Sequence, residues 1–176
     1  MKRIDIPYDT LSMNVFKTWE TQWLLLCAGE HPESFNIMTV AWGGFGVLWA
    51  RPVAFIFVRP ERYTYKFIES HDSFTLSAFP EEHKDKLSFC GKRTGRDTDK
   101  VKECGFSPIP SRKVKAPGFD EAELIVECRK VYFSDLVPKN FLAEYIPANY
   151  PTRNYHRIYI GEVLAISGSP RFSVPQ

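Results

Sequence analysis

Two apolar, β-rich runs that lie close together constrain this chain most. They cover Ile37–Trp42 and Val53–Val58. Short continuous runs that are rich in β-branched and aromatic residues predict neighbouring buried strands. Glycine readily adopts the backbone conformations that tight turns require. We therefore expect a turn at the glycines between the runs, which are Gly43, Gly44 and Gly46.

Polar side chains stand at both ends of this pair of runs. Asn36, whose amide can both donate and accept hydrogen bonds, precedes the first run, and the second is followed by Arg59, Arg62, Tyr63 and Thr64. A sheet surface with polar ends, and with glycines that let the backbone come close, suits a flat, polar-edged, anionic ligand. Flavin mononucleotide (FMN) fits this description. From these residues alone, an ordinary hairpin whose arginine and threonine cap the next helix is the alternative.

Length and composition point to one folded domain without a strong electric field. The 176 residues are 44% hydrophobic and 15% aromatic, and we expect a single domain over residues 1–176 with its core at about 20–168. The net charge is only +2, from 23 basic and 21 acidic residues. This balance argues against nucleic acid or an anionic membrane as the partner.

The cysteines and the amino terminus suggest a reducing compartment. The chain has four cysteines, no CxxC pair, and no histidine at ligand spacing from any cysteine. We therefore expect no metal site. No stretch approaches the roughly 18 uninterrupted apolar residues of a membrane span, and the first residues lack the apolar segment of a signal peptide. We expect a cytoplasmic protein.

The remaining elements predict a mostly antiparallel β-barrel with short helical inserts, because no long helix separates successive strands. The expected helices cover Tyr63–Ser70, a segment opened by Pro80, and Thr98–Cys104, the last capped by Asp97 and ended by Gly105. We expect a polar loop over Cys90–Asp97. The expected strands are Trp23–Ala28, Phe74–Phe79, Leu124–Val131, Phe133–Val137 and His156–Ile166.

Six short segments recur in one order over most of the chain, and together they resemble a known family. They are Asn36–Trp42, Arg59–Thr64, Phe74–Ser77, Thr94–Asp97 with Lys100, Glu127–Arg129, and His156 with Gly161–Val163. The pattern is similar to that of the flavin reductase-like FMN-binding split-barrel proteins, and within them to the flavoredoxin branch. No single segment is specific; their order and spacing carry the resemblance.

The resemblance implies a Greek-key-like antiparallel split β-barrel, assembled as a homodimer that binds FMN non-covalently near the subunit interface. It implies that the strand from Asn36 to Trp42 lies along the isoalloxazine ring. The alternating N–H and C=O groups of a strand edge would then match the donors and acceptors of the ring. The residues of this strand that we expect at the ring are Asn36, Met38, Thr39, Val40, Ala41 and Trp42.

The same resemblance assigns the phosphate to the segment after the second run. Arginine binds phosphate oxygens bidentately, and the first turn of a helix offers free N–H groups. The expected phosphate ligands are Arg59, Arg62, Tyr63 and Thr64. Lys100, which follows the loop containing Thr94, would bring a cation near the flavin. Thr94 stands where many relatives have serine and keeps the hydroxyl.

Two further residues have expected roles with open alternatives. His156 is the expected catalytic residue, because such reductases tend to position a histidine near the nicotinamide–flavin site, where it could shield or hydrogen-bond the hydride donor or tune the protonation of the ring. The alternative is an edge-strand histidine without a role. Cys90 could be redox-active, although a free cysteine is more often a small buried hydrophobic residue.

The expected function is electron transfer from NAD(P)H, or from a protein donor, through bound FMN to an acceptor. No Rossmann G-x-G-x-x-G motif is present, so NAD(P)H would stack transiently on the flavin. The alternatives are a non-enzymatic FMN-binding electron carrier, an FMN- or haem-binding module, and an interaction domain that has lost its ligand. The loop Phe141–Tyr155 would decide between reductase and carrier by covering the ring or leaving it open.

Overall fold

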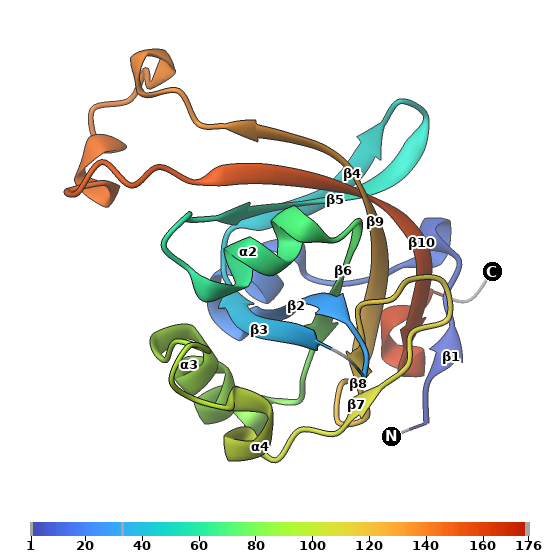
Figure 1. The fold of residues 1–176 in the computed structure, drawn as a ribbon. Helices are drawn as coiled ribbons and strands as arrows, with labels where there is room; N and C mark the ends of the chain where they lie inside the picture. The colour runs from blue at the N-terminus through green and yellow to red at the C-terminus, as the bar shows by residue number, and fades with distance from the viewer. Residues whose placement is uncertain (1, 33, 175–176) are drawn as a thin grey trace.

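In the computed structural model, which describes residues 2–32 and 34–174, one antiparallel sheet of eight strands curves into an open barrel (Figure 1). Its strands pair in the order β3-β2-β6-β9-β10-β5-β4, and β1 pairs with the carboxyl-terminal end of β10. No backbone ladder joins β3 to β4 in the described part of the chain, so the barrel is split there. The expected antiparallel split barrel is confirmed.

The strands of the barrel are β1 (Ile4–Asp5), β2 (Leu24–Glu30), β3 (Ser34–Val40), β4 (Gly43–Leu48), β5 (Arg51–Val58), β6 (Ser73–Ala78), β9 (Leu124–Asp135) and β10 (Arg157–Gly168). A separate small ladder joins β7 (Pro108–Ile109) to β8 (Gly118–Phe119). The helices are α1 (Val15–Lys17), which continues into a π-turn at Thr18–Gln22, α2 (Tyr63–Ser70), α3 (Lys84–Lys92) and α4 (Lys100–Cys104). None of the helices in the described residues is long and apolar enough to cross a bilayer.

Apolar packing on both faces of β2 explains its uninterrupted apolar sequence. Leu24, Leu26 and Ala28 point into the barrel. Leu25 and Cys27 point outward into a second core formed with α3, α4 and β8. A strand with two buried faces loses the usual alternation of polar and apolar residues. This second core fixes α3 and α4 beside β3, as Figure 1 also shows.

The expected glycine turn is wrong. Gly43 and Gly44 lie within β4, which pairs with β5, and the chain turns at Trp49 and Ala50, whose φ angles are 52° and 55°. A Cβ on Gly43 would lie 2.5 Å from the ring of Trp19, and one on Gly44 would lie 2.4 Å from the ring of Phe55. These glycines therefore allow close packing inside a strand.

Three other boundaries differ from the prediction. The first strand of the central pair ends at Val40, and Ala41 and Trp42 form the turn into β4. Residues 124–135 form one continuous strand, because β10 pairs along the whole of it. Cys90 lies in the last turn of α3 and not in a loop, since α3 extends to Lys92.

The amino-terminal cap of α4 also differs from the prediction. The side chain of Asp99, and not that of Asp97, accepts the hydrogen bond from the backbone N–H of Lys102 at 3.1 Å. The predicted helix end is confirmed, because Gly105 follows α4 in the left-handed conformation. Helix α2 begins and ends where predicted, at Tyr63 and Ser70.

The hairpin of β9 and β10 extends beyond the barrel and ends in the loop 136–156. Figure 1 shows this arm projecting away from the rest of the molecule. Two short 3-10 turns, Pro138–Asn140 and Pro147–Asn149, shape the loop.

Candidate functional site

Three adjoining cavities follow the split of the barrel. The first, here called the histidine compartment, has a volume of about 340 Å³. It lies between the end of β3 and the start of β10. Its lining residues are Met38, Thr39, Val40, Ala41, Trp42, Phe57, Arg59, Glu61, Arg62 and His156.

His156 is held in one orientation by three neighbours. Its Nε2 lies 3.4 Å from the Nε of Arg59, and its Nδ1 lies 2.9 Å from the hydroxyl of Tyr150. The Trp42 ring packs against the imidazole, with 4.7 Å between the ring centroids. An arginine N–H can only donate, so Nε2 accepts, and the imidazole proton lies on Nδ1 and is donated to Tyr150.

The pKa of His156 is lowered to about 4, first by burial and then by the positive charges of Arg59 and Arg62. The imidazole is therefore neutral at neutral pH. A neutral ring that contacts Trp42 and faces the compartment is a fixed hydrogen-bonding and packing group. It contributes no positive charge to the cavity.

Arg59 is directed toward the arm. Its Nη2 donates to the backbone carbonyl of Asn149 at 2.9 Å, and its guanidinium carbon lies 5.3 Å from the centroid of the Tyr150 ring. The structure therefore places Arg59 at the rim of the histidine compartment, beside His156. Arg62, three residues later, lines the second cavity as well.

The second cavity, the cationic compartment, has a volume of about 160 Å³ and adjoins the first through Met38, Glu61 and Arg62. Five basic side chains line it. In the described part of the chain, none of the five forms an ion pair. Its full lining is Met38, Glu61, Arg62, Tyr63, Thr64, Lys92, Arg93, Thr94, Gly95, Arg96 and Lys100.

The carboxyl-terminal end of α3 holds two of these cations in place. Lys100 Nζ donates to the carbonyl of Cys90 at 3.2 Å, and Arg62 Nη2 donates to the carbonyl of Gly91 at 2.6 Å. The last carbonyls of a helix lack partners within the helix and attract cations. Lys100 is only 4% exposed. Burial, reinforced by the charge of Arg62, lowers its pKa to about 8.

Two threonines join β3 to the helices on either side of the site. The hydroxyl of Thr64, in the first turn of α2, donates to Oδ1 of Asn36 at 2.9 Å. The hydroxyl of Thr39 donates to the carbonyl of Leu87 in α3 at 2.5 Å. Because both bonds start or end on β3, they fix the distance of α2 and α3 from the strand that lines the cavities.

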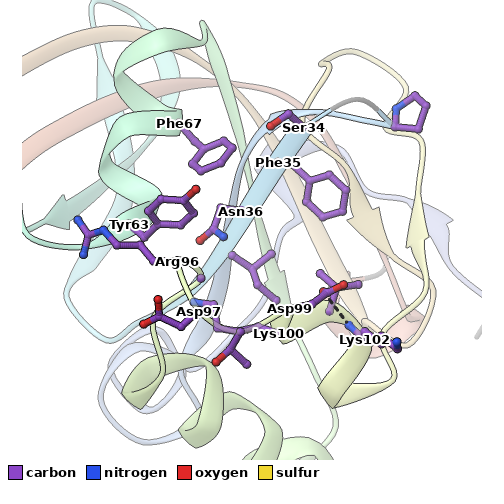
Figure 2. Close-up of a pocket in the computed structure, with 15 residues that line it drawn as sticks. Ser34, Phe35, Asn36, Tyr63, Phe67, Arg96, Asp97, Asp99, Lys100 and Lys102 are labelled. Carbon is purple, nitrogen blue, oxygen red and sulfur yellow. Dashed lines mark hydrogen bonds between the residues drawn. The ribbon is translucent and has the colours of Figure 1, made fainter.

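The third cavity, the aromatic compartment, is the largest at about 590 Å³. It adjoins the cationic compartment through Tyr63, Gly95, Arg96 and Lys100. Figure 2 shows Tyr63 and Phe67 from α2 on one side of β3, Phe35 on its other side, and Asp97, Asp99 and Lys102 below them. The lining consists of Pro32, Ser34, Phe35, Asn36, Ile37, Tyr63, Phe67, Gly95, Arg96, Asp97, Thr98, Asp99, Lys100, Val101 and Lys102.

Most of the residues singled out from the sequence lie around these cavities, in different places. Asn36 lines the aromatic compartment and not the histidine compartment. Cys90 lines none of the three; its thiol is buried, 3.6 Å from the thiol of Cys104. Burial raises the pKa of the Cys90 thiol to about 12. That thiol therefore stays protonated at neutral pH, which is the less reactive form.

Sequence reasoning missed several lining residues. They are Phe35, Phe57, Glu61, Phe67, Lys92, Arg93, Gly95, Arg96, Asp97, Asp99 and Lys102. The available signal was the basic run of Lys92, Arg93 and Arg96, followed by Lys100 and Lys102. Tyr150, which fixes His156, lies in a loop whose path no local pattern predicts.

Known proteins share this fold. Flavoredoxin of Desulfovibrio vulgaris (Miyazaki F) is 20% identical with a TM-score of 0.68, covering 94% of this chain and 80% of its own. An FMN-binding domain of a flavin reductase-like enzyme from Shewanella baltica OS155 is 14% identical with a TM-score of 0.66, and the match covers 95% of this chain and 77% of that domain. The NADH:FAD oxidoreductase of Streptomyces globisporus C-1027, solved with NAD and FAD fragments, is 15% identical with a TM-score of 0.62, covering 85% and 76%.

The sequence itself identifies the family. Residues 18–172 match the family described as "Flavin reductase like domain". This match spans the barrel from the turn before β2 to the end of β10, all strands except β1, and includes all three compartments. The chain therefore belongs to the flavin reductase-like domain family.

Proposed function

We propose that this protein binds FMN non-covalently and transfers electrons from NAD(P)H, or from a protein donor, to an acceptor. The observation that carries the proposal is a buried cation, without a carboxylate partner in the described residues, that lines the cationic compartment. Lys100 is 4% exposed and has no carboxylate partner among the described residues. A dianionic phosphate in the cationic compartment would supply the missing charge.

The two smaller compartments suit the two parts of FMN. The cationic compartment has Arg62 and Lys100 for the phosphate, together with the first turn of α2 at Tyr63 and Thr64. The histidine compartment has an aromatic wall at Trp42 and a strand end at Met38–Val40 for the isoalloxazine ring. Met38 and Arg62 line both compartments, so the two parts of one ligand could occupy neighbouring spaces.

Bound FMN would supply the redox chemistry, accepting hydride at N5 and passing electrons on. The residues of this chain would bind and orient it. His156 keeps its proton on Nδ1 toward Tyr150, so Nε2 remains an acceptor engaged by Arg59. The pKa of His156 is about 4, so its imidazole is neutral at neutral pH and carries no second proton to donate to the ring. We assign His156 a positioning role beside the ring.

Access to the ring favours a small donor. In the described residues, no side chain from 141–155 lines the histidine compartment; Asn149 and Tyr150 pack behind Arg59 and His156. A nicotinamide could therefore reach the compartment without displacing the loop. This supports the reductase over the protein-to-protein carrier.

We also propose that the protein is a homodimer. Apolar side chains are exposed along the β4–β5 hairpin and the arm; they include Val47, Trp49, Tyr132, Phe133, Leu142 and Tyr145. Trp49 and Tyr132 lie next to each other, with 6.2 Å between their ring centroids. Exposed aromatic and apolar side chains of this kind are typical of a protein interface. All four cysteines are free and buried, which suits a reducing cytoplasm.

An absorption spectrum of the purified protein, incubated with FMN and then desalted, tests the proposal. We expect a retained flavin spectrum that bleaches promptly on anaerobic addition of NADH or NADPH. Bleaching only with dithionite or a reduced protein would indicate a carrier. A colourless protein that takes up no FMN would refute the flavin assignment.

A further inference from the structure

We propose that Cys90 and Cys104 form a reversible redox-modification site, in which a disulfide bond closes the segment that carries the basic wall of the cationic compartment. The two thiols lie 3.6 Å apart, Cys90 in the last turn of α3 and Cys104 at the end of α4. Sulfur atoms in contact need only a small adjustment of the two side chains to bond. The effect on FMN rests on the proposed function, whereas the bond itself does not.

The two cysteines stand at the ends of the basic segment of the site. Six residues between positions 90 and 104 line the cationic compartment, and four of them are cationic. They are Lys92, Arg93, Thr94, Gly95, Arg96 and Lys100. A bond between the cysteines would therefore join the two ends of the basic wall.

Like charges oppose the closed position of this wall in the reduced protein. Its four cations repel one another, and none of them forms an ion pair in the part of the chain that the structure describes. One hydrogen bond, from Lys100 to the carbonyl of Cys90, joins α4 to α3 on the side of the compartment. A disulfide would hold the two helices together against the repulsion and restrict the wall before an anion binds. We therefore expect the disulfide form to bind the FMN phosphate more tightly.

Cys104 is the thiol that an oxidant reaches first. It is 5% exposed and lies between exposed residues of the chain, whereas Cys90 is fully buried. Burial raises the pKa of both thiols, but a hydrogen bond from Cys90 and the charges of Lys86 and Lys100 oppose the rise at Cys104. Because burial disfavours the reactive thiolate, the site should respond slowly, to sustained oxidation.

Hydrogen peroxide is the oxidant of the proposed reaction. The Cys104 thiolate attacks one peroxide oxygen, so that an S–O bond forms, the O–O bond breaks, and the departing hydroxide takes up a proton to become water. The Cys90 sulfur then attacks the Cys104 sulfur; the S–S bond forms, the S–O bond breaks, and a second water leaves with the Cys90 proton. Two thiols thus give two electrons and two protons to one peroxide.

Treatment of the reduced wild type with hydrogen peroxide tests the bond directly. The intact mass should fall by two hydrogens, and tryptic digestion without reductant should give segments 87–92 and 103–112 as one linked peptide. Dithiothreitol should reverse both changes. Cys104→Ser should prevent the bond, and Cys27→Ala, which keeps both thiols of the pair, should still form it.

Two measurements then compare the reduced and the oxidised protein. Limited trypsin digestion of the folded protein needs no FMN, and the disulfide should slow cleavage after Lys92, Arg93 and Arg96. FMN should bind the oxidised protein about fivefold or more tightly, the low end of typical coupling between sites. Because coupling is reciprocal, a fivefold effect means that FMN lowers the reduction potential of the pair by about 20 mV. Peroxide should cause neither difference in Cys104→Ser.

The inference is overturned if peroxide leaves Cys90 and Cys104 unlinked in the folded protein, if the bond does not slow trypsin, or if FMN binds the linked protein no more tightly than the reduced one. A disulfide that forms and slows cleavage in a protein that binds no FMN in either state would instead refute the proposed function and support the modification site. The wild type alone, reduced and oxidised, gives each of these results if a variant is poorly folded.

Discussion

FMN affinity should follow a bell-shaped pH profile whose alkaline side belongs to Lys100. In the ligand-free protein the pKa of Lys100 is lowered to about 8, mainly by burial. A bound phosphate dianion would raise that pKa again, because an opposite charge favours the ammonium form. Above pH 8, binding must therefore take up a proton, and affinity falls as pH rises. On the acid side, affinity falls as the phosphate protonates, with a pKa of about 6.

The magnitude follows from this pKa. Affinity loses a factor of ten for each pH unit above the pKa of the free site, so FMN should bind roughly tenfold more weakly at pH 9 than at pH 7. Lys100→Met should remove this alkaline limb. At pH 7 it should also weaken FMN binding by about 1.5–3 kcal/mol, the range for a hydrogen bond to a charged group.

Quenching of flavin fluorescence between pH 5 and pH 9.5 measures both effects. Riboflavin, which lacks the phosphate, should show no alkaline limb with the wild type. Lys86→Met on α3 is a matched control, because Lys86 lines none of the compartments. An alkaline limb that persists in Lys100→Met, or a wild type without one, would show that Lys100 does not contact the phosphate.

Three further predictions concern the histidine, the barrel core and the assembly. His156 should titrate near pH 4 in an NMR experiment on its imidazole, because burial and two arginines oppose the charge; a midpoint near 6.5 would contradict this. Gly161→Ala should lower the free energy of unfolding in urea by about 1–3 kcal/mol, because a Cβ there would lie 2.6 Å from the ring of Phe74 on β6. Gly46→Ala is the control, because a Cβ at Gly46 would have no atom within 4 Å, and it should change the free energy of unfolding by less than about 0.5 kcal/mol. Tyr132→Glu should convert the dimer to a monomer, as measured by light scattering after gel filtration. Phe16→Glu, a substitution of an exposed residue away from the arm, should leave the dimer intact. Equal masses for the two variants would show that the interface lies elsewhere.

Elements with strong local signals could be predicted from the sequence. Helix α2 begins at Tyr63, after Pro60 and the end of an apolar run, and these signals act within a few residues. Gly105 ends α4 because its left-handed conformation favours glycine. The continuous apolar run at Trp23–Ala28 predicted a buried strand, and β2 is buried on both faces.

The predictions were wrong where the conformation of a residue depends on neighbours that are distant in the sequence. Gly43 and Gly44 lie in a strand, since Trp19 and Phe55 occupy the space that side chains would fill. The sequence around residues 97–99 contains two aspartates that could each cap α4, and in the structure Asp99 is the cap. The break expected at Tyr132 is absent, because β10 pairs on through it.

The sequence by itself determined the family, most of the barrel strands and the chemical types that gather at the site. Only the tertiary structure decided which of those residues share a cavity. Arg59 and Arg62 are three residues apart, yet Arg59 turns toward His156 and the arm while Arg62 reaches the end of α3. The physical reason is that α3, the arm and β3 meet through long-range packing, and the directions of these side chains depend on partners about 30 to 100 residues away.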